Sequence, residues 1–243
     1  MPKDKRRVAQ ILVLVLFISA EGCIARKNAA APVPAPSGYQ GILGNDTSRL
    51  QESLFKDHQE VLSNEDIQRI LTARITLEDR LRLAVLNLNP RFASSQMISD
   101  LESQNSQRLL QALRSSAQLT EVRMMPTLLI PEKRTVPYLR EAAARFQADL
   151  LLVYTTRVQA FRQDRFIGAD EVRAGCIVES VLLDVRTGIV THTAQSAEGI
   201  AAKKSPSDLN FSETVAKAQS EASGKALLKL ADAVVEYLKE VRQ

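Results

Sequence analysis

Hydrophobic and polar positions follow two different periods along this chain, and each period predicts a kind of secondary structure. Residues 81–88 are apolar at nearly every position, which is typical of a strand whose two faces are both covered. Further strands are expected at 121–130 and 148–154, and helical spacing of apolar residues is found at 97–119 and 136–146. Because strands and helices alternate in this order, right-handed crossovers should make the strands parallel neighbours.

The pattern changes to strand-like alternation in the second half of the chain. Residues 172–185 alternate between two apolar faces, and a tight turn over 184–188 leads into a further strand at 189–197. These two strands are therefore expected to form an antiparallel hairpin. Residues 210–213 (Asn-Phe-Ser-Glu) resemble a capping box, and the apolar residues that follow, up to Val241, predict one long amphipathic helix.

These elements predict the fold class α/β, with a mixed β-sheet flanked by helices. The domain is expected to span residues 61–243 and to begin with a short helix that Ser63 caps, ahead of Glu65 and Asp66. About 180 residues are enough for one domain with its own core.

The first 22 residues have the three parts of a secretory signal peptide. A basic start at residues 1–7 precedes an apolar run over 8–20, shorter than the roughly 17–25 residues of a membrane-spanning helix. Residues 20–23 (Ala-Glu-Gly-Cys) resemble the lipobox of lipoprotein signal peptidase, so we expect cleavage before Cys23 and lipid, palmitate included, on its thiol. The Ala and Glu of this stretch depart from the usual pattern. The alternative is ordinary cleavage nearby, with Cys23 left as a free thiol.

Residues 23–60 are expected to be a lipidated start followed by a flexible tether. The stretch 28–37 is rich in alanine and proline, a composition that cannot bury a core. Ile24, rather than an aspartate, follows the cysteine, which by resemblance to enterobacterial sorting favours the outer membrane. The expected location is therefore the bacterial outer membrane, lipid-anchored, with the domain facing the periplasm.

Charge and composition narrow the classes of partner. The chain carries 32 basic and 28 acidic residues, and loss of residues 1–22 removes four basic and two acidic ones, which leaves 28 against 26. Such a balance does not argue for nucleic acid, and the absence of tryptophan argues against base-stacking platforms. If Cys23 carries lipid, Cys176 has no partner within the chain, so a disulfide framework is excluded and Cys176 should be a small buried residue.

Three stretches, in their order along the chain, resemble a known family. Residues 83–88 (Leu-Ala-Val-Leu-Asn-Leu), 148–153 (Ala-Asp-Leu-Leu-Leu-Val) and 181–190 (Val-Leu-Leu-Asp-Val-Arg-Thr-Gly-Ile-Val) look like strand and hairpin motifs of the family of the curli-assembly lipoprotein CsgG and the penicillin-binding-protein activator LpoB. The resemblance implies an anticodon-binding-domain-like sandwich. It also implies a non-enzymatic lipoprotein that binds another protein of the cell envelope.

The sequence offers no site for catalysis, a metal or a cofactor. The two histidines, His58 and His192, lie far apart and both are expected in solvated positions, so zinc ligands are lacking. No Gly-x-Ser-x-Gly motif is present, and residues 220–225 lack the first glycine of a phosphate-binding loop. We therefore expect that the protein is not an enzyme.

The segment from Arg157 to Arg173 is the candidate partner-binding site. It combines basic and aromatic residues, a composition enriched at protein interfaces. The five residues expected to bind a partner are Arg157, Phe161, Arg162, Arg165 and Phe166. The alternative is an extended hairpin whose charges simply face water.

Two functions of different classes follow. The first is a periplasmic adaptor or regulator of cell-envelope assembly that binds another envelope protein and could also self-associate. The alternative is a subunit of a CsgG-like outer-membrane secretion channel. Residues 155–175 place charged or amide side chains on both faces of a strand, and neither face suits contact with lipid, which favours the adaptor.

Overall fold

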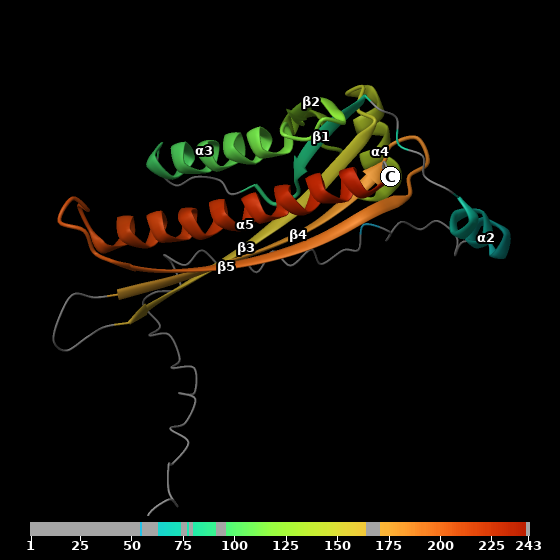
Figure 1. Ribbon diagram of the computed structural model, residues 1–243. Coiled ribbons are helices and arrows are strands. Elements are labelled where there is room, and N and C mark those ends of the chain that lie inside the picture. The colour runs from blue at the N-terminus through green and yellow to red at the C-terminus, as the bar shows by residue number, and fades with distance from the viewer. Residues whose placement is uncertain are drawn as a thin grey trace, which may run out of the picture. The chain divides into compact units, whose positions relative to one another are not determined.

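A five-stranded mixed sheet with helices on both faces forms the core of the protein (Figure 1). The computed structural model describes residues 54, 63–73, 77, 80–90, 96–163 and 171–241, all within the unit formed by residues 38–243. The strands lie in the order β2-β1-β3-β4-β5. The predicted α/β class, with a mixed sheet flanked by helices, is confirmed. The expected signal peptide and most of the expected tether lie outside the described residues.

The first three strands form the parallel half of the sheet. β1 (Leu81–Asn87) lies between β2 (Leu119–Met124) and β3 (Leu150–Gln163), and both pairings are parallel. Residues Leu83 to Leu86 of β1 are all buried, because helices cover both faces of this strand. The continuous apolar run therefore predicted its position correctly.

Three long strands form the antiparallel half. β3, β4 (Glu171–Asp184) and β5 (Val190–Lys203) have 14 residues each and pair in sequence order. The prediction of a strand at 172–185 matches β4 closely, but for β3 and β5 the sequence predicted strands only at 148–154 and 189–197, and both of these predictions end too early. On the face that stays exposed, the missing parts are polar or small except at Phe161, so they contain few large apolar residues to signal a strand.

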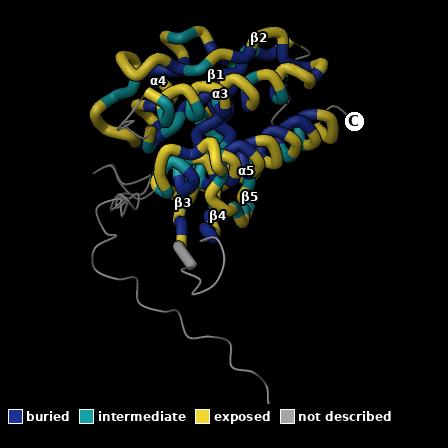
Figure 2. The backbone as a smooth tube through the Cα atoms, turned by 90° about the vertical axis from the view of Figure 1, so that its left-hand side faces the viewer, coloured by how far each residue is buried: buried dark blue, intermediate teal, exposed yellow. Residues whose placement is uncertain are grey.

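Helices cover the two faces of the sheet unequally. α3 (Gln96–Leu113) and α5 (Phe211–Val241) pack on one face, and α4 (Val136–Arg145) packs on the other. The sides of α3 and α5 that face the sheet are buried, whereas their outer sides are exposed (Figure 2). α5 buries alanine at positions 218, 222, 226 and 231, and these small side chains let the helix lie close to the strands.

The chain turns away from the sheet soon after β2. The sequence predicted a strand over 121–130, whereas β2 ends at Met124 and a 3-10 helix, η2, occupies Thr127–Leu129. Pro126 precedes η2 in an extended conformation and has no backbone N–H with which to continue a ladder. This proline, rather than the later Pro131, ends the extended segment.

A short helix, α2 (Asn64–Thr72), begins where it was predicted. The Ser63 hydroxyl accepts a hydrogen bond from the backbone N–H of Asp66 at 3.1 Å, as an N-cap residue should. No residue of α2 is buried, and Leu71 is 72% exposed. The prediction of the helix is confirmed, but its apolar residues do not join the core.

An ion pair joins the beginnings of β1 and β3. The Asp149 carboxylate accepts hydrogen bonds from the backbone N–H, Nε and Nη2 of Arg82 at 2.9, 3.0 and 3.1 Å. The hydrogen bonds from the Arg82 side chain lower the pKa of Asp149 from its usual value, against the opposing effect of burial. The aspartate of the Ala-Asp-apolar stretch therefore holds two strands in register.

Candidate functional site

The outer halves of β3, β4 and β5 extend past the end of β1 and form what we call the arm. β1 pairs with β3 only as far as Tyr154, so residues 155–163, 171–179 and 195–203 continue as a three-stranded sheet. One face of the arm is covered, since Val172, Ala174, Cys176 and Val178 belong to the core beneath α5. We call the other face, which carries the alternate residues, the open face.

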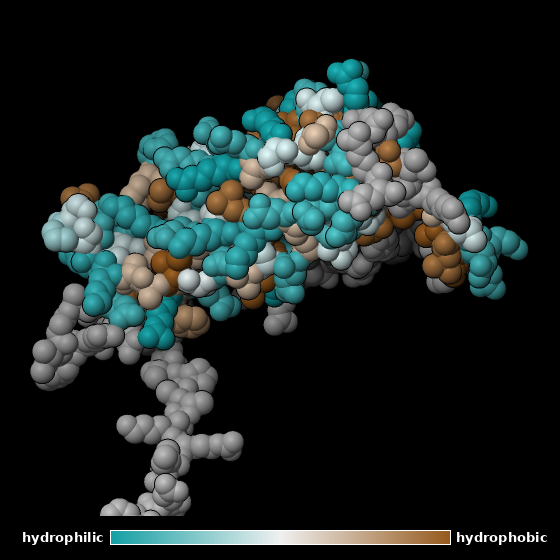
Figure 3. All heavy atoms as spheres, viewed as in Figure 1, coloured by the Kyte–Doolittle hydropathy of each residue, from teal (hydrophilic) through white to brown (hydrophobic). Residues whose placement is uncertain are grey.

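The centre of the open face is flat and apolar. Phe161 is 62% exposed and Ile177 is 39% exposed. The residues between and beside them on β4 and β5 are small, and they are Gly175, Ala197, Gly199 and Ala201. By contrast, the surface that α3 and α5 turn outward is mostly hydrophilic, with hydrophobic residues showing between the two helices (Figure 3).

Charged residues surround this apolar centre and already pair with one another. Arg157 Nη2 lies 2.8 Å from Glu179 Oε1, and the Gln195 amide donates to the same oxygen at 3.3 Å. Arg173, which lies opposite Phe161 in the β3–β4 ladder, has its Nε 3.7 Å from Glu171 Oε1. Both arginines keep about half or more of their side chains exposed, so they can still reach a partner.

The structure places the predicted site residues as follows. Arg157 and Phe161 lie on the open face of β3, four residues apart. The backbone of Arg162 pairs with Val172, and its side chain lies outside the described residues. Arg165, Phe166 and Cys23 lie outside them altogether. Sequence reasoning missed Arg173 and Ile177 as site members, although their odd-numbered positions opposite the buried residues of β4 could have identified them.

β5 forms an edge of the sheet, with β4 as its one neighbour among the described strands. From Ala194 to Ala202 it contains no proline and a single charged residue, Glu198, whose carboxylate pairs with Lys229 on α5. Edge strands are usually blocked by charges, prolines or bulges, because their free N–H and C=O groups can pair with another strand. The outer side of β5 therefore offers backbone N–H and C=O groups with which an added strand could pair, beside the open face.

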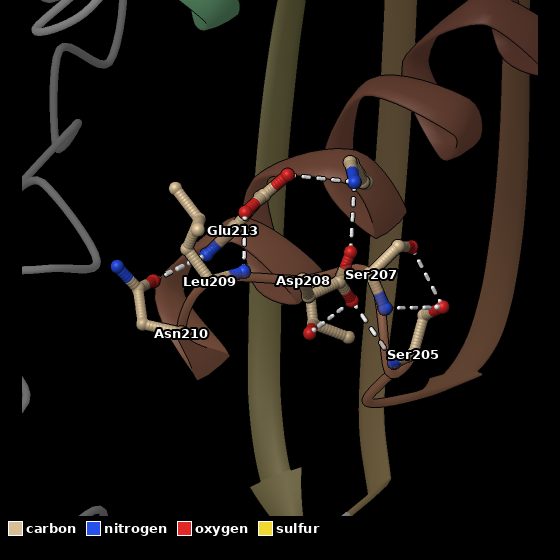
Figure 4. Close-up of polar contacts among 8 residues, drawn as sticks. Ser205, Ser207, Asp208, Leu209, Asn210 and Glu213 are labelled. Carbon is tan, nitrogen blue, oxygen red and sulfur yellow. Dashed lines mark hydrogen bonds and ion pairs between the residues drawn. The ribbon is translucent and has the colours of Figure 1, made fainter.

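A charged cluster at the start of α5 has a structural role. The Asp208 carboxylate, which is buried, accepts from the Ser205 N–H at 3.0 Å and the Thr214 hydroxyl at 2.7 Å, and pairs with Lys217 Nζ at 2.7 Å (Figure 4). These hydrogen bonds, with that of Lys217 the strongest, lower the pKa of Asp208 to about 2. Lys217 Nζ also lies 2.7 Å from Glu213 Oε1, so this ammonium group joins two carboxylates and the cluster holds the turn into α5.

The predicted capping box at the same place is confirmed only in part. The Asn210 side chain accepts from the Glu213 N–H at 3.0 Å, as expected of an N-cap. The Glu213 carboxylate, however, accepts from the N–H of Leu209 at 2.8 Å rather than from that of Asn210 (Figure 4). Within the described part of the chain, no three His, Cys, Asp or Glu side chains gather as a metal site would require.

One cysteine prediction and one histidine prediction can be checked, and the first is confirmed whereas the second is wrong. Cys176 is buried as expected. His192 was expected to be solvated, and this is wrong: its ring stacks on Tyr237 with centroids 4.5 Å apart, and burial lowers its pKa. The threonines around His192 in the sequence suggested an exposed hairpin, whereas this part of β5 lies against the last turns of α5. His58 lies outside the described residues.

Comparison with known proteins gives structural likenesses at low sequence identity. No family model and no curated protein matches the chain. The neuraminyllactose-binding hemagglutinin homolog from Helicobacter pylori is 12% identical with a TM-score of 0.42, over 70% of this chain and 95% of that one. The PelC dodecamer from Paraburkholderia phytofirmans is 19% identical with a TM-score of 0.29, over 65% and 93%. A minor lipoprotein from Acinetobacter baumannii is 13% identical with a TM-score of 0.34, over 68% and 92%.

The specific resemblance to the CsgG and LpoB family therefore stays a prediction. None of the helices in the described ranges is both long enough and apolar enough to cross a membrane.

Proposed function

We propose that the protein is a lipid-anchored lipoprotein of the bacterial outer membrane that binds another cell-envelope protein through the open face of the arm and acts without catalysing a reaction. The anchor is inferred from the signal-peptide pattern of residues 1–22, the lipobox-like stretch before Cys23, and the Pro/Ala-rich tether. Several acyl chains on one cysteine would hold the protein stably at the membrane, whereas one chain binds only marginally.

The observation that carries the binding role is the exposed apolar centre of the open face. Phe161 and Ile177 remain exposed although the large apolar residues on the other face of the same strands are buried or partly buried in the core. Exposed aromatic and aliphatic side chains on a flat surface ringed by charged residues are typical of protein–protein interfaces. Small residues at Gly175 and Gly199 leave the surface level, so a partner's side chains can lie against the strands.

The nature of the open face also favours a protein over a small molecule or a lipid. It is a flat sheet surface rather than a concave pocket, and small ligands need concave sites that enclose most of their area. Arg157, Arg173 and Glu179 on the same face would lose hydration in contact with lipid tails. A protein partner can instead supply polar groups opposite these charges and apolar groups opposite the centre.

The anchor is tested by labelling cells with a palmitate analogue. The wild-type protein should incorporate the label and sediment with membranes, and Cys23→Ala should do neither. Membrane-bound Cys23→Ala protein, or an unlabelled wild-type protein, would contradict the anchoring part of the proposal and leave the binding surface to be judged by its own experiment.

The binding surface is tested by crosslinking in intact cells with the double variant Phe161→Ser, Ile177→Thr. Threonine keeps the β-branch that suits a strand, so folding should be retained and is checked by thermal melting. The variant should lose the crosslinked partner by at least about tenfold, as is usual when central apolar residues of an interface are truncated. The matched control is the double variant Leu128→Ser, Leu209→Ser. Both leucines lie away from the open face and are even more exposed than Phe161, at 95% and 91%.

The control variant should capture the partner as the wild type does. Equal capture by the open-face variant and the wild type would refute the proposed surface. Loss of capture in the control as well would show that exposed leucines at many places contribute, and would equally refute a site confined to the open face.

A further inference from the structure

The two edges of the sheet differ in how well they are protected against an added strand. β2, at one edge, has six residues, and Arg123 Nε pairs with Glu121 Oε1 at 2.9 Å. Pro126 follows β2 and cannot extend its ladder. β5, at the other edge, has 14 residues (Figure 1), and over 193–201 its one charged residue is Glu198. Short length, charges and prolines usually block an edge, so β5 is the unprotected one.

The backbone groups of the odd-numbered residues of β5 point away from β4. The Ala194 carbonyl accepts a hydrogen bond at 3.1 Å from the Oγ of Ser180, its partner across the ladder. The carbonyl of Leu182, which pairs with His192, likewise accepts from Thr191 Oγ1 at 3.2 Å. The even-numbered residues of β5 therefore turn their N–H and C=O groups towards β4. Because these groups alternate in direction along a strand, those of residues 193, 195, 197, 199 and 201 point outward. Within the described ranges, no strand pairs with this side of β5.

We propose that β5 pairs with β5 of a second copy of this chain. The two strands run antiparallel about a twofold axis that is perpendicular to the sheet and passes beside Ala197, so the two sheets join into one. Such a contact uses the unprotected edge of each copy. It therefore closes at a dimer and does not continue into a fibre.

The side chains of β5 are complementary to themselves in this register. With Ala197 on the axis, each larger side chain faces a smaller one of the second copy, and the pairs are Thr193 with Ala201, Gln195 with Gly199, and Ile200 with Ala194. Directly opposed side chains of this kind are the unit that stabilises a sheet.

The neighbouring registers are less favourable. An axis at Glu198 would place this carboxylate directly opposite its own copy, and like charges that face each other across a ladder destabilise the pairing. An axis at Ser196 would place Ile200 opposite His192, whose ring is already stacked on Tyr237. The side chains therefore favour the axis at Ala197, which opposes neither like charges nor two large groups.

The strength of the contact follows from its size. Each outward-facing residue of 193–201 exchanges two hydrogen bonds with its opposite number, which gives about ten across the contact, a number usual for a protein interface. One strand edge buries less than the about 800 Å² per partner of a standard interface, so we expect a dissociation constant on the order of 10–100 µM in solution. The lipid anchor of the proposed function would confine copies to one membrane and raise their effective concentration. Only this last step rests on the proposed function.

The first test measures the mass of the particle by sedimentation equilibrium. It uses residues 23–243, with Cys23→Ser so that no lipid is present, at concentrations from about 5 to about 500 µM. The protein should pass from monomer to dimer over this range and form nothing larger. A protein that is still monomeric at the highest concentration, or one that continues into larger assemblies, would overturn the proposal.

Two lysine variants test the position of the axis. Ala197→Lys places two ammonium groups opposite each other and should weaken the dimer about fivefold or more. Ala201→Lys adds the same charge to the same strand but faces Thr193, so it should change the dissociation constant less than about twofold. Ala197 and Ala201 are both exposed, so the fold should be retained, which thermal melting checks. Equal weakening by the two variants would contradict the proposed axis.

Disulfide formation with diamide tests the same geometry directly. The two Cα atoms of Ala197→Cys would lie about 5.5 Å apart, within the range that a disulfide can span, so this variant should crosslink to itself. Those of Ala201→Cys would lie about 27 Å apart along the strands, so this variant should not. A mixture of Thr193→Cys and Ala201→Cys proteins should crosslink to each other. Cys176 is buried in all of them. Equal crosslinking of Ala197→Cys and Ala201→Cys would overturn the proposal.

The open-face variant Phe161→Ser, Ile177→Thr separates this contact from the proposed partner surface. Both substitutions lie on strands other than β5, so the variant should dimerise as the wild type does. Loss of the dimer in this variant would assign the contact between copies to the open face and overturn pairing through β5. Partner capture and dimerisation are thus measured separately, and failure of one proposal leaves the other standing.

Discussion

Replacement of Gly224 with alanine sets helix propensity against packing, and the structure indicates that packing prevails. Gly224 lies in the middle of α5, where glycine costs about 1 kcal/mol relative to alanine. On propensity alone, Gly224→Ala should stabilise the protein by that amount. A Cβ at this position, however, would lie 2.6 Å from Oδ1 of Asn105 on α3.

The energetic cost can be estimated from what Asn105 would lose. Its side chain must withdraw by about 0.8 Å to restore ordinary van der Waals contact at 3.4 Å. Asn105 is 6% exposed, and its Nδ2 donates to the carbonyl and hydroxyl oxygens of Ser220 at 2.8 and 3.0 Å. Overpacking costs about 1–3 kcal/mol, and a buried amide left without partners costs a similar amount. The two costs together are about 2–6 kcal/mol, so after subtraction of the gain in propensity Gly224→Ala should destabilise the domain by about 1–5 kcal/mol.

Urea denaturation of four proteins tests this reasoning: the wild type, Gly224→Ala, Asn105→Ala and the double variant. Asn105→Ala alone should cost about 1–2 kcal/mol, because its hydrogen bonds across the helix pair are lost. The double variant should be about as stable as Asn105→Ala or more stable, since the clash is gone and the propensity gain remains. Asp232 is exposed on the same helix, so Asp232→Ala serves as a control that changes helix propensity without a clash. It should change the free energy of unfolding by less than about 1 kcal/mol. A Gly224→Ala protein that is more stable than the wild type would refute the predicted close approach of α3 and α5.

Three further predictions rest on other local features. Asp149→Asn should cost about 2 kcal/mol of unfolding free energy in urea, because the charge-assisted hydrogen bonds from Arg82 to this carboxylate are lost; an unchanged midpoint would contradict the role of this pair. Gln147 adopts a left-handed conformation with φ 60°, so Gln147→Gly should stabilise the protein by about 0.5–1 kcal/mol, and a lower melting temperature would argue against strain at this residue. Asp208 has a folded pKa of about 2, below its unfolded value of about 3.9, so its stabilising effect should be complete above pH ~4 and disappear as the pH falls towards 2. The melting temperature of Asp208→Asn should therefore be lower at pH 6 and approach that of the wild type near pH 2, and a difference independent of pH would exclude the ionised carboxylate as the cause.

The parts of the fold that could be predicted are those where burial alone determines the residue pattern. β1 is apolar at nearly every position because helices cover both of its faces, so its bounds followed from the sequence within one residue. The outer half of β3 has one face under α5 and the other exposed, and it mixes Arg157 and Gln159 with Val158 and Ala160. A strand of this kind is stabilised by its two neighbours in the sheet, and those pairings bring together residues far apart in the chain. For Arg173 and Ile177, alternation along β4 indicates that both lie on the exposed face, and the register of β3 and β4 adds that this face carries Phe161 as well.

The crevice between α3 and α5, beyond the carboxyl ends of β1 and β2, illustrates a different limit, because its polar groups come from three elements with no shared motif. Asn87 ends β1, Glu102 lies in α3 and Tyr154 lies in β3, and no spacing between them in the sequence signals a site. What the sequence did contain was the order strand, helix, strand, helix, strand, from which parallel pairing follows. That order alone implies a crevice beyond residue 88 and near residue 125, where β1 and β2 end. Its position was therefore within reach of sequence reasoning, whereas its lining was not, because the residues that α3 turns towards the crevice are decided by the contact of α3 with α5. That contact depends on Gly224 and Asn105, so Gly224→Ala, which tests the packing of α3 on α5, should also alter the shape of the crevice, which Asn105 helps to line.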